Sequence, residues 1–312
     1  MGRSSASSSS RPVWGLDVGG TTAILGSLDA DGRFEVLSEL RTTPLAAPVE
    51  TLRQAAGIVG DSGRGIGAIG IGVAGLVDFD GGIVLKAPNL PTWEGFAVRE
   101  EASRLFGVPS VADNDCNVFA AGAVSLGEVP SSGLWIVITF GTGIGGSLVL
   151  DGAIQRGRGQ AGEVGHMSIQ AEGGLACPCG SSGCWERYAG REALLAYYRD
   201  SGGDPEDIEP RSIADRARNG CGSALEAFDR LGAWIGRGLA NINNCFFPHG
   251  IAIGGGLTGA MDLWEQSARR RFRENAMLPV WNVVVLEAVS STGALGAAVL
   301  ASRLLMGRED AP

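Results

Sequence analysis

The chain has 312 residues, of which 45% are hydrophobic, enough for the cores of two ordinary globular domains. Its formal net charge of −9 argues against nucleic acid or an anionic membrane as the main partner. No stretch is long and apolar enough to span a membrane. Lys86 is the only lysine and is followed by Ala-Pro, so any nucleotide chemistry must work without a phosphate-loop lysine.

The segment 1–12 is rich in serine and lacks the apolar core of a secretory signal. We therefore expect a disordered tail there. The cysteines cluster without any evident pairing, which suits a reducing interior and favours a cytoplasmic location.

The residues from Val13 to Gly32 predict an apolar strand, a Gly19-Gly20 turn, a second strand and an Asp-Gly turn. The same order returns between Trp135 and Gly152, where a Gly/Thr turn again separates two apolar strands. We interpret the two copies as a duplicated unit, which predicts two related α/β domains.

The remaining elements follow from hydrophobic periodicity and from turn residues. Between the two copies we predict helices at 48–60, 97–106 and 117–126, strands at 68–73 and 109–112, and a loop at 89–93. After the second copy we predict helices at 190–199, at 228–244, from Leu257 and at 293–304, an exposed loop at 200–210 and a strand at 248–253. The predicted domains are 13–116, completed by 293–312, and 117–292.

Three Gly-rich turns follow predicted strands, at 17–22, 141–146 and 254–256. Glycine allows backbone N–H groups to approach an anion closely, and Thr hydroxyls add donors. Three such turns in one chain suggest a bound nucleotide, although each alone is typical of an ordinary tight turn. The candidate nucleotide-binding residues are Gly19, Gly20, Thr21, Thr22, Gly141, Thr142, Gly143, Gly254, Gly255 and Gly256.

Two acidic positions end predicted strands. Asp17, beside the first Gly turn, could hold Mg²⁺ or one of its waters, or could simply cap the turn. Asn114-Asp115 precedes a helix, where Asp115 could accept a hydroxyl proton and Asn114 could bond a substrate. The alternative of equal weight is that one of this pair caps the helix.

Three cysteines and one histidine lie within 24 residues, at His166, Cys177, Cys179 and Cys184. They could be small core residues, or a disulfide and one spare thiol. Pro, Gly and Ser fill the gaps, however, and a Cys-x-Cys pair is awkward to bridge, so the spacing favours a closed Cys₃His zinc site. Such a site is structural and would fix the flanking carboxylates. We expect the other three thiols, Cys116, Cys221 and Cys245, to be buried, and His249 and the run 269–271 to have no ligand role.

The pattern Glu163-x-Gly-His166, followed by Cys177-x-Cys179-Gly-x-x-Gly-Cys184-x-Glu186, resembles the signature of the zinc-containing ROK sugar kinases and their repressor relatives. The similarity extends from about Val13 to about Leu304. It implies two RNase H-like domains of the actin-like ATPase type, with an active-site cleft between them. The first two Gly turns would face the phosphates of ATP, and the third would border the adenosine.

The resemblance also implies the sugar contacts. His166 would bind zinc through one ring nitrogen and face the sugar with the other, and Glu163 and Glu186 would accept hydrogen bonds from sugar hydroxyls. Asp115 would be the catalytic base. Gly75, Asn89 and Asn114 would complete the sugar site. Loss of zinc should then weaken sugar binding and leave ATP affinity within a few-fold.

The implied activity is ATP-dependent phosphorylation of a hexose 6-hydroxyl, with ATP, Mg²⁺ and structural Zn²⁺, in a homodimer or homotetramer. Glucose is the leading substrate, and N-acetylmannosamine, N-acetylglucosamine, mannose, fructose or allose are alternatives. One rival is a sugar-responsive repressor, but only 16 residues precede Asp17, too few for a winged helix. Another rival is a sugar sensor without catalysis, although Asp17, Asp115 and all three Gly turns are present.

Overall fold

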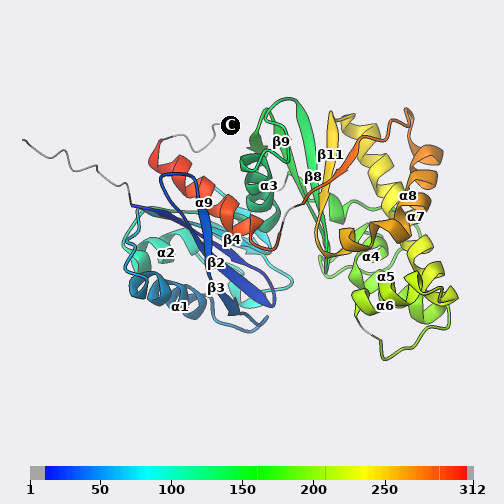
Figure 1. The fold of residues 1–312 in the computed structure, drawn as a ribbon, viewed down its shortest axis with the longest axis horizontal. Coiled ribbons are helices and arrows are strands. Elements are labelled where there is room, and N and C mark those ends of the chain that lie inside the picture. The colour runs from blue at the N-terminus through cyan, green and yellow to red at the C-terminus, as the bar shows by residue number, and fades with distance from the viewer. Residues whose placement is uncertain (1–10, 160, 208, 288, 308–312) are drawn as a thin grey trace, which may run out of the picture. The chain divides into compact units, whose positions relative to one another are not determined.

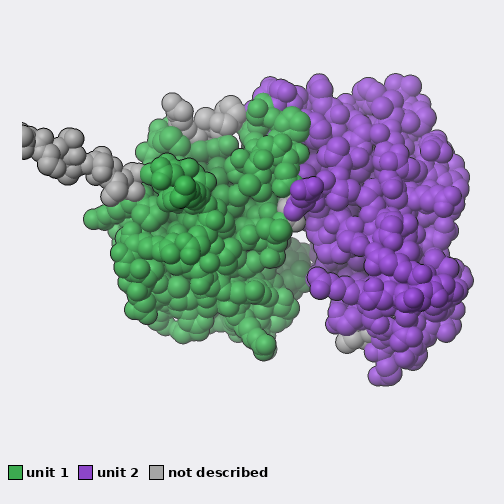
Figure 2. All heavy atoms as spheres, in the orientation of Figure 1, with its two compact units in different colours: residues 1–131, 152–160, 288–312 green, residues 132–151, 161–287 purple. Residues whose placement is uncertain are grey.

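The computed structural model describes residues 11–159, 161–207, 209–287 and 289–307. The chain forms two compact units, shown in green and purple in Figure 2. Unit 1 comprises residues 1–131, 152–160 and 288–312, and unit 2 comprises residues 132–151 and 161–287. Within the described part of the chain, no helix has both the length and the apolarity needed to cross a membrane.

The sheet of unit 1 has the strand order β3-β2-β1-β4-β7. Strands β1, β2 and β3 are antiparallel neighbours, whereas β4 and β7 run parallel to β1. The carboxyl ends of the three parallel strands therefore meet at one edge, where Asp17 and Asn114 lie. The bounds are β1 Val13–Val18, β2 Thr22–Leu28, β3 Phe34–Arg41, β4 Ala68–Val73 and β7 Ser110–Asn114.

Alternation along the strands assigns the two faces of this sheet. Trp14, Leu16 and Val18 belong to a buried cluster with residues of α1 (Pro48–Asp61) and α2 (Val98–Phe106). The intervening Gly15 faces α9 (Thr292–Leu305), and a Cβ there would lie 1.8 Å from the Ala294 carbonyl oxygen. Glycine at this position therefore lets helix and sheet approach closely.

Helix α3 (Asp115–Ser125) packs against α9 within unit 1, as Figure 1 shows. A Cβ on Gly296 would lie 1.7 Å from the Val118 carbonyl oxygen, which explains the small residues of α9. Because α3 belongs to unit 1, the two units do not divide the chain at residue 116. A short hairpin, β5 (Leu76–Asp78) with β6 (Ile83–Lys86), and the turn η1 (Pro91–Trp93) complete this unit.

The second sheet has the order β10-β9-β8-β11-β12, with β8 and β9 antiparallel and β11 and β12 parallel to β8. This arrangement repeats the first sheet and confirms the duplication that the sequence predicts. The strands are β8 Leu134–Phe140, β9 Ile144–Leu150, β10 Ala153–Gln155, β11 Gly250–Gly254 and β12 Val283–Val285.

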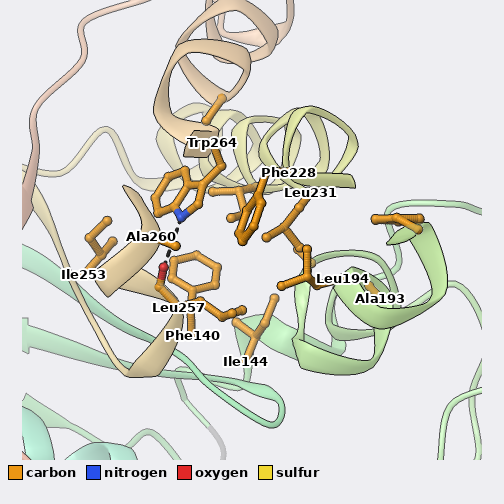
Figure 3. Packing of buried hydrophobic residues seen from close by; sticks show 14 of the residues in the cluster. Phe140, Ile144, Ala193, Leu194, Phe228, Leu231, Ile253, Leu257, Ala260 and Trp264 are labelled. Carbon is orange, nitrogen blue, oxygen red and sulfur yellow. Dashed lines mark hydrogen bonds between the residues drawn. The ribbon is translucent and has the colours of Figure 1, made fainter. Parts of the chain in front are cut away.

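The core of unit 2 lies between this sheet and its helices (Figure 3). Phe140 packs near Trp264, whose indole Nε1 donates to the Leu257 carbonyl at 3.0 Å. Glycines on α7 let α8 pack closely, since a Cβ on Gly236 would lie 2.1 Å from the Ala268 carbonyl oxygen. The helices are α4 Glu186–Ala189, α5 Arg191–Asp200, α6 Pro210–Arg218, α7 Gly222–Phe246 and α8 Met261–Asn275, with 3₁₀ turns η2 Val164–His166 and η3 Gly256–Ala260.

Several predicted boundaries were wrong. The helix predicted at 117–126 begins at Asp115, because the Asn114 side chain caps it. The helix predicted from Leu257 begins at Met261, after a 3₁₀ turn. Cys116 is buried as predicted, but Cys221 is half-buried and Cys245 is exposed near the end of α7. Most of the predicted tail, residues 1–10, lies outside the described residues.

Candidate functional site

The first Gly turn lies at the carboxyl end of β1. The Gly19 N–H donates to the Thr22 carbonyl at 2.9 Å, and the Thr42 hydroxyl donates to the Gly19 carbonyl at 2.7 Å. A Cβ on Gly20 would lie 3.5 Å from the Cβ and the carbonyl oxygen of Asn89, so the turn and the 89–93 loop are neighbours. The structure therefore brings together two predicted contributors, one for nucleotide and one for sugar.

Asp17 lies beside this turn, close to the backbone of two other elements. A Cβ on Gly293 would lie 2.1 Å from Asp17 Oδ2, and one on Gly72 would lie 2.9 Å from Oδ1. Burial, and to a smaller extent the negative charge of Asp115, raise the pKa of Asp17 from 3.8 to about 7. A cation beside Asp17 would favour the charged carboxylate, which fits the predicted role in holding Mg²⁺.

Asn114 and Asp115 lie where β7 passes into α3. The Asn114 side-chain oxygen accepts from the N–H groups of Cys116 and Asn117, at 2.8 and 3.2 Å, and so caps the helix. Its amide nitrogen donates to Asp115 Oδ1 and to the Gly75 carbonyl, each at 2.9 Å. Asn114 thus joins the predicted base to the predicted sugar turn at Gly75, and both of its amide hydrogens are used in doing so.

Asp113 and Arg156 form a buried ion pair that sequence reasoning missed. Arg156 Nε donates to Asp113 Oδ2 at 2.8 Å, and the two side chains are 10% and 2% exposed. They lie 43 positions apart in the sequence, and nothing local distinguishes Arg156 from the other arginines. The only signal available was the Asp-Asn-Asp run at the end of a predicted strand.

In unit 2, the two remaining Gly turns lie next to each other. The turn from Gly141 to Gly143 closes with a 2.9 Å hydrogen bond from the Gly141 N–H to the Gly143 carbonyl. Gly255 has a φ of 94°, and a Cβ there would lie 2.4 Å from the Phe140 carbonyl oxygen, just before the other turn. Only glycine accommodates both this backbone conformation and this close approach.

His166, Cys177, Cys179 and Cys184 form one cluster, in which the four ligand atoms lie within 4.8 Å of one another. The Cys179 and Cys184 sulfurs are 3.7 Å apart, and Cys177 Sγ is 3.8 Å from His166 Nδ1. A tetrahedral zinc ion with bonds of about 2.3 Å to sulfur places its sulfur ligands about 3.8 Å apart. These four residues therefore fit a closed zinc site.

Burial acts on the protonation of these thiols. Burial, together with the neighbouring thiols, raises the pKa of Cys184 to about 12, and burial also raises the pKa of Cys177. A metal ion reverses this tendency because it binds the thiolates directly. All six cysteines are free, so no disulfide competes for these ligands.

The two glutamates lie beside this cluster within unit 2. Glu163 Oε2 is 3.8 Å from His166 Nε2, so Nδ1 faces the sulfurs while Nε2 faces a carboxylate. Partial burial raises the pKa of Glu163, His166 lowers it and Glu186 raises it. Glu186 Oε2 accepts from the Ile144 N–H at 3.0 Å, which attaches it to the turn at 141–146.

Comparison with known proteins identifies the family. The ROK family model matches residues 13–304. The chain belongs to the ROK family. It is 33% identical over 309 residues to the glucokinase of Streptomyces coelicolor, with 92% of this chain and 96% of that protein covered. It is 30% identical over 271 residues to the N-acetyl-D-glucosamine kinase of Vibrio cholerae, with 82% and 88% covered.

A solved ROK structure is similar over nearly the same extent. The ROK family glucokinase from Streptomyces griseus, crystallised with glucose and AMPPNP, aligns with a TM-score of 0.81 and 32% identity. The alignment covers 94% of this chain and 99% of that one. This ROK chain therefore has the actin-like ATPase fold that the sequence resemblance implied.

Each unit of this ROK protein carries its own set of predicted groups. Unit 1 brings together Asp17, the turn at 19–22, Gly75, Asn89, Asn114 and Asp115. Unit 2 brings together the turns at 141–146 and 254–256, the metal cluster, Glu163 and Glu186. Sequence reasoning missed Asp113 and Arg156, and it did not foresee the bond from Ile144 to Glu186.

Proposed function

We propose that this ROK protein transfers the γ-phosphoryl group of ATP to the 6-hydroxyl of a hexose, with glucose as the preferred acceptor. The observation that carries the proposal is the placement of Asp115 at the start of α3. Its carboxylate is held by Asn114 and the Cys116 N–H and lies near enough to Asp17 for the two charges to interact. The similarity to the Streptomyces coelicolor glucokinase supports glucose as the acceptor.

Asp115 would accept the hydroxyl proton as the phosphoryl group is transferred. The Gly turns at 19–20 and 141–143 would bind the phosphates through backbone N–H groups, and the turn at 254–256 would border the adenosine. Asp17 would hold Mg²⁺, which when bound neutralises charge on the phosphates. The absence of a phosphate-loop lysine fits this arrangement, since backbone donors and the metal would supply the positive potential.

Glu163, Glu186 and His166 would bind the sugar hydroxyls, with Gly75, Asn89 and Asn114 completing the pocket. Both amide hydrogens of Asn114 already bond Gly75 and Asp115, so a sugar hydroxyl would share one of these donors or donate to Oδ1. The zinc ion, bound by His166 and the three thiols, would keep Nε2 of His166 directed toward Glu163 and the sugar.

An N-acylhexosamine is the second candidate acceptor. The similarity to the Vibrio cholerae N-acetyl-D-glucosamine kinase supports it, because the two proteins align over 82% of this chain. We also propose that the protein acts inside the cell as a homodimer or homotetramer. Six free cysteines suit a reducing compartment, and light scattering of the purified protein tests the assembly.

An ADP-release assay tests the proposal directly. Purified protein, with ATP and Mg²⁺, is offered glucose, mannose, fructose, allose, N-acetylglucosamine and N-acetylmannosamine. We expect the largest kcat/KM for glucose, with Asp115→Asn as the inactive control. Absence of sugar-dependent ADP release with every acceptor would refute the proposed kinase activity. A higher kcat/KM for an N-acetylhexosamine than for glucose would show that the N-acetylhexosamine is the preferred acceptor.

A further inference from the structure

The ion pair between Arg156 and Asp113 is buried where β7 ends. The two side chains are 10% and 2% exposed, and Arg156 Nε lies 2.8 Å from Asp113 Oδ2. Removing two charges from water is costly, and a buried ion pair is therefore weak evidence for stability. A role in fixing one local geometry accounts better for its presence beside the predicted base.

The other oxygen of Asp113 is also engaged. Oδ1 accepts from the backbone N–H of Asn114 and from Nδ2 of Asn117, each at 2.8 Å. The carboxylate thus accepts three hydrogen bonds, one of which fixes the backbone of the residue that caps α3. Rotation of this carboxylate would disturb all three bonds together.

Asn114 continues the series of contacts toward the predicted reacting groups. Its amide donates to Asp115 Oδ1 and to the Gly75 carbonyl, each at 2.9 Å. Hydrogen bonds therefore connect Arg156, Asp113, Asn114 and Asp115 in that order. All four residues belong to unit 1.

Arg156 also contacts the turn that follows β5. Its guanidinium carbon lies 3.7 Å from the ring centroid of Phe79, just beyond β5. A planar, permanently charged guanidinium can stack on this ring while its Nε bonds Asp113, a combination that lysine cannot reproduce. Arg156 thus contacts both the end of β7 and the far end of β5, and Asn114 bonds Gly75 just before β5.

We propose that Arg156 is a positioning residue for phosphoryl transfer. Acting through Asp113 and Asn114, it orients the Asp115 carboxylate toward the hydroxyl that loses its proton. This inference rests on the proposed kinase function. Since displacement by about 1 Å can slow a reaction by about 100-fold, loss of this restraint should reduce kcat. A merely structural pair would instead change stability and leave the turnover of the folded enzyme intact.

The test compares Arg156→Gln, Asp113→Asn and the double variant with wild type. Arg158→Gln is the matched control, because Arg158 is exposed and lies only two positions away. We expect kcat to fall about 10- to 100-fold in each single variant, with the KM for ATP within about 3-fold of wild type. Because both residues act through one series of contacts, the fall in kcat of the double variant should be no larger than that of the more impaired single variant.

Asp113→Asn keeps the shape and Oδ1 of the side chain but directs an amide donor at Arg156 Nε. It removes the counter-charge of an arginine side chain that is 10% exposed, whereas Arg156→Gln leaves a carboxylate that is 2% exposed without its counter-charge. Asp113→Asn therefore decides the matter if Arg156→Gln does not fold. Near-wild-type kcat in folded Asp113→Asn, or losses that multiply in the double variant, would overturn the inference. Wild-type protein without turnover on any hexose would instead overturn the proposed function, so the two failures are distinguishable.

Discussion

Replacing Asp17 with asparagine should make the stability of this protein less dependent on pH. The pKa of Asp17 is raised from 3.8 to about 7 in the folded chain, first by burial and then by the charge of Asp115. The folded state therefore binds this proton more tightly than the unfolded state does. The stability that depends on protonated Asp17 is therefore fully present below pH 3.8 and is lost as the pH rises through 7.

The size of this loss follows from the two pKa values. With 3.8 unfolded and about 7 folded, ionisation of Asp17 costs about 1.7 kcal/mol at pH 5 and about 4 kcal/mol at pH 8. Asp17 is half-buried, so solvent screens some of the cost. We therefore expect the advantage of Asp17→Asn over wild type to grow by between about 1 and 2.5 kcal/mol from pH 5 to pH 8.

Urea unfolding in magnesium-free buffer at pH 5 and pH 8 measures this difference. Asp61→Asn, at the exposed end of α1, is the matched control and should follow wild type at both pH values. Parallel stability changes in Asp17→Asn and wild type would refute a raised pKa at Asp17. Added Mg²⁺ should reduce the wild-type pH dependence, because a cation favours the charged carboxylate.

Three further outcomes are expected. Elemental analysis of protein purified without added metal should find about one zinc per chain, and a value near zero with an ordered loop would contradict the four-ligand site. Asp115→Asn should bind sugar normally in calorimetry but lose about 10²- to 10⁴-fold in kcat, so near-normal turnover would exclude it as the base. Gly296→Ala should destabilise the protein by about 1–3 kcal/mol in urea unfolding, because its Cβ would meet the Val118 carbonyl oxygen at 1.7 Å. Gly57→Ala, whose Cβ would meet nothing within 4 Å, is the control, and equal effects of the two would contradict close packing at Gly296.

The sequence predicted those features of the molecule whose residues lie close together along the chain. The metal cluster could be found because its four ligands lie close together in the sequence with loop-forming residues between them. The Gly turns could be found because each follows an apolar strand. The capping role of Asn114 was also foreseeable, since Asn before a helix commonly caps it, but its simultaneous bonds to Gly75 and Asp115 were not.

The contacts that the sequence did not predict join residues far apart in the chain. Arg156 meets Asp113 across 43 positions, and Ile144 meets Glu186 across 42. Such contacts depend on which strands are neighbours and on the register between them, and periodicity reports neither. The exposed Cys245 was wrongly predicted for a related reason, because the exposure of a helical residue depends on what packs against it.

The bond between Ile144 and Glu186 changes what loss of the metal should do. The sequence suggested that loss of zinc would weaken sugar binding and leave ATP affinity within a few-fold. In the structure, the Ile144 N–H at the predicted phosphate turn donates to Glu186, two residues after the metal ligand Cys184. The Arg191 N–H, shortly beyond, also donates to the Gly141 carbonyl at 3.1 Å. Disorder in the metal loop should therefore reach this turn.

We now expect Cys179→Ser to reduce glucose affinity by about 10- to 100-fold, as misplaced supporting residues commonly do. We expect AMPPNP affinity to fall by about 5- to 10-fold, since the bond to a charged acceptor that holds Ile144 contributes on the order of 1.5 kcal/mol or more and only part of it would be lost. Calorimetric titration of each ligand measures both, with Cys245→Ser, an exposed thiol of the same unit, as the control. Unchanged AMPPNP affinity would show that the turn at 141–146 does not depend on Glu186. Equal losses of both affinities would indicate unfolding of unit 2 instead of a local change passed through one carboxylate.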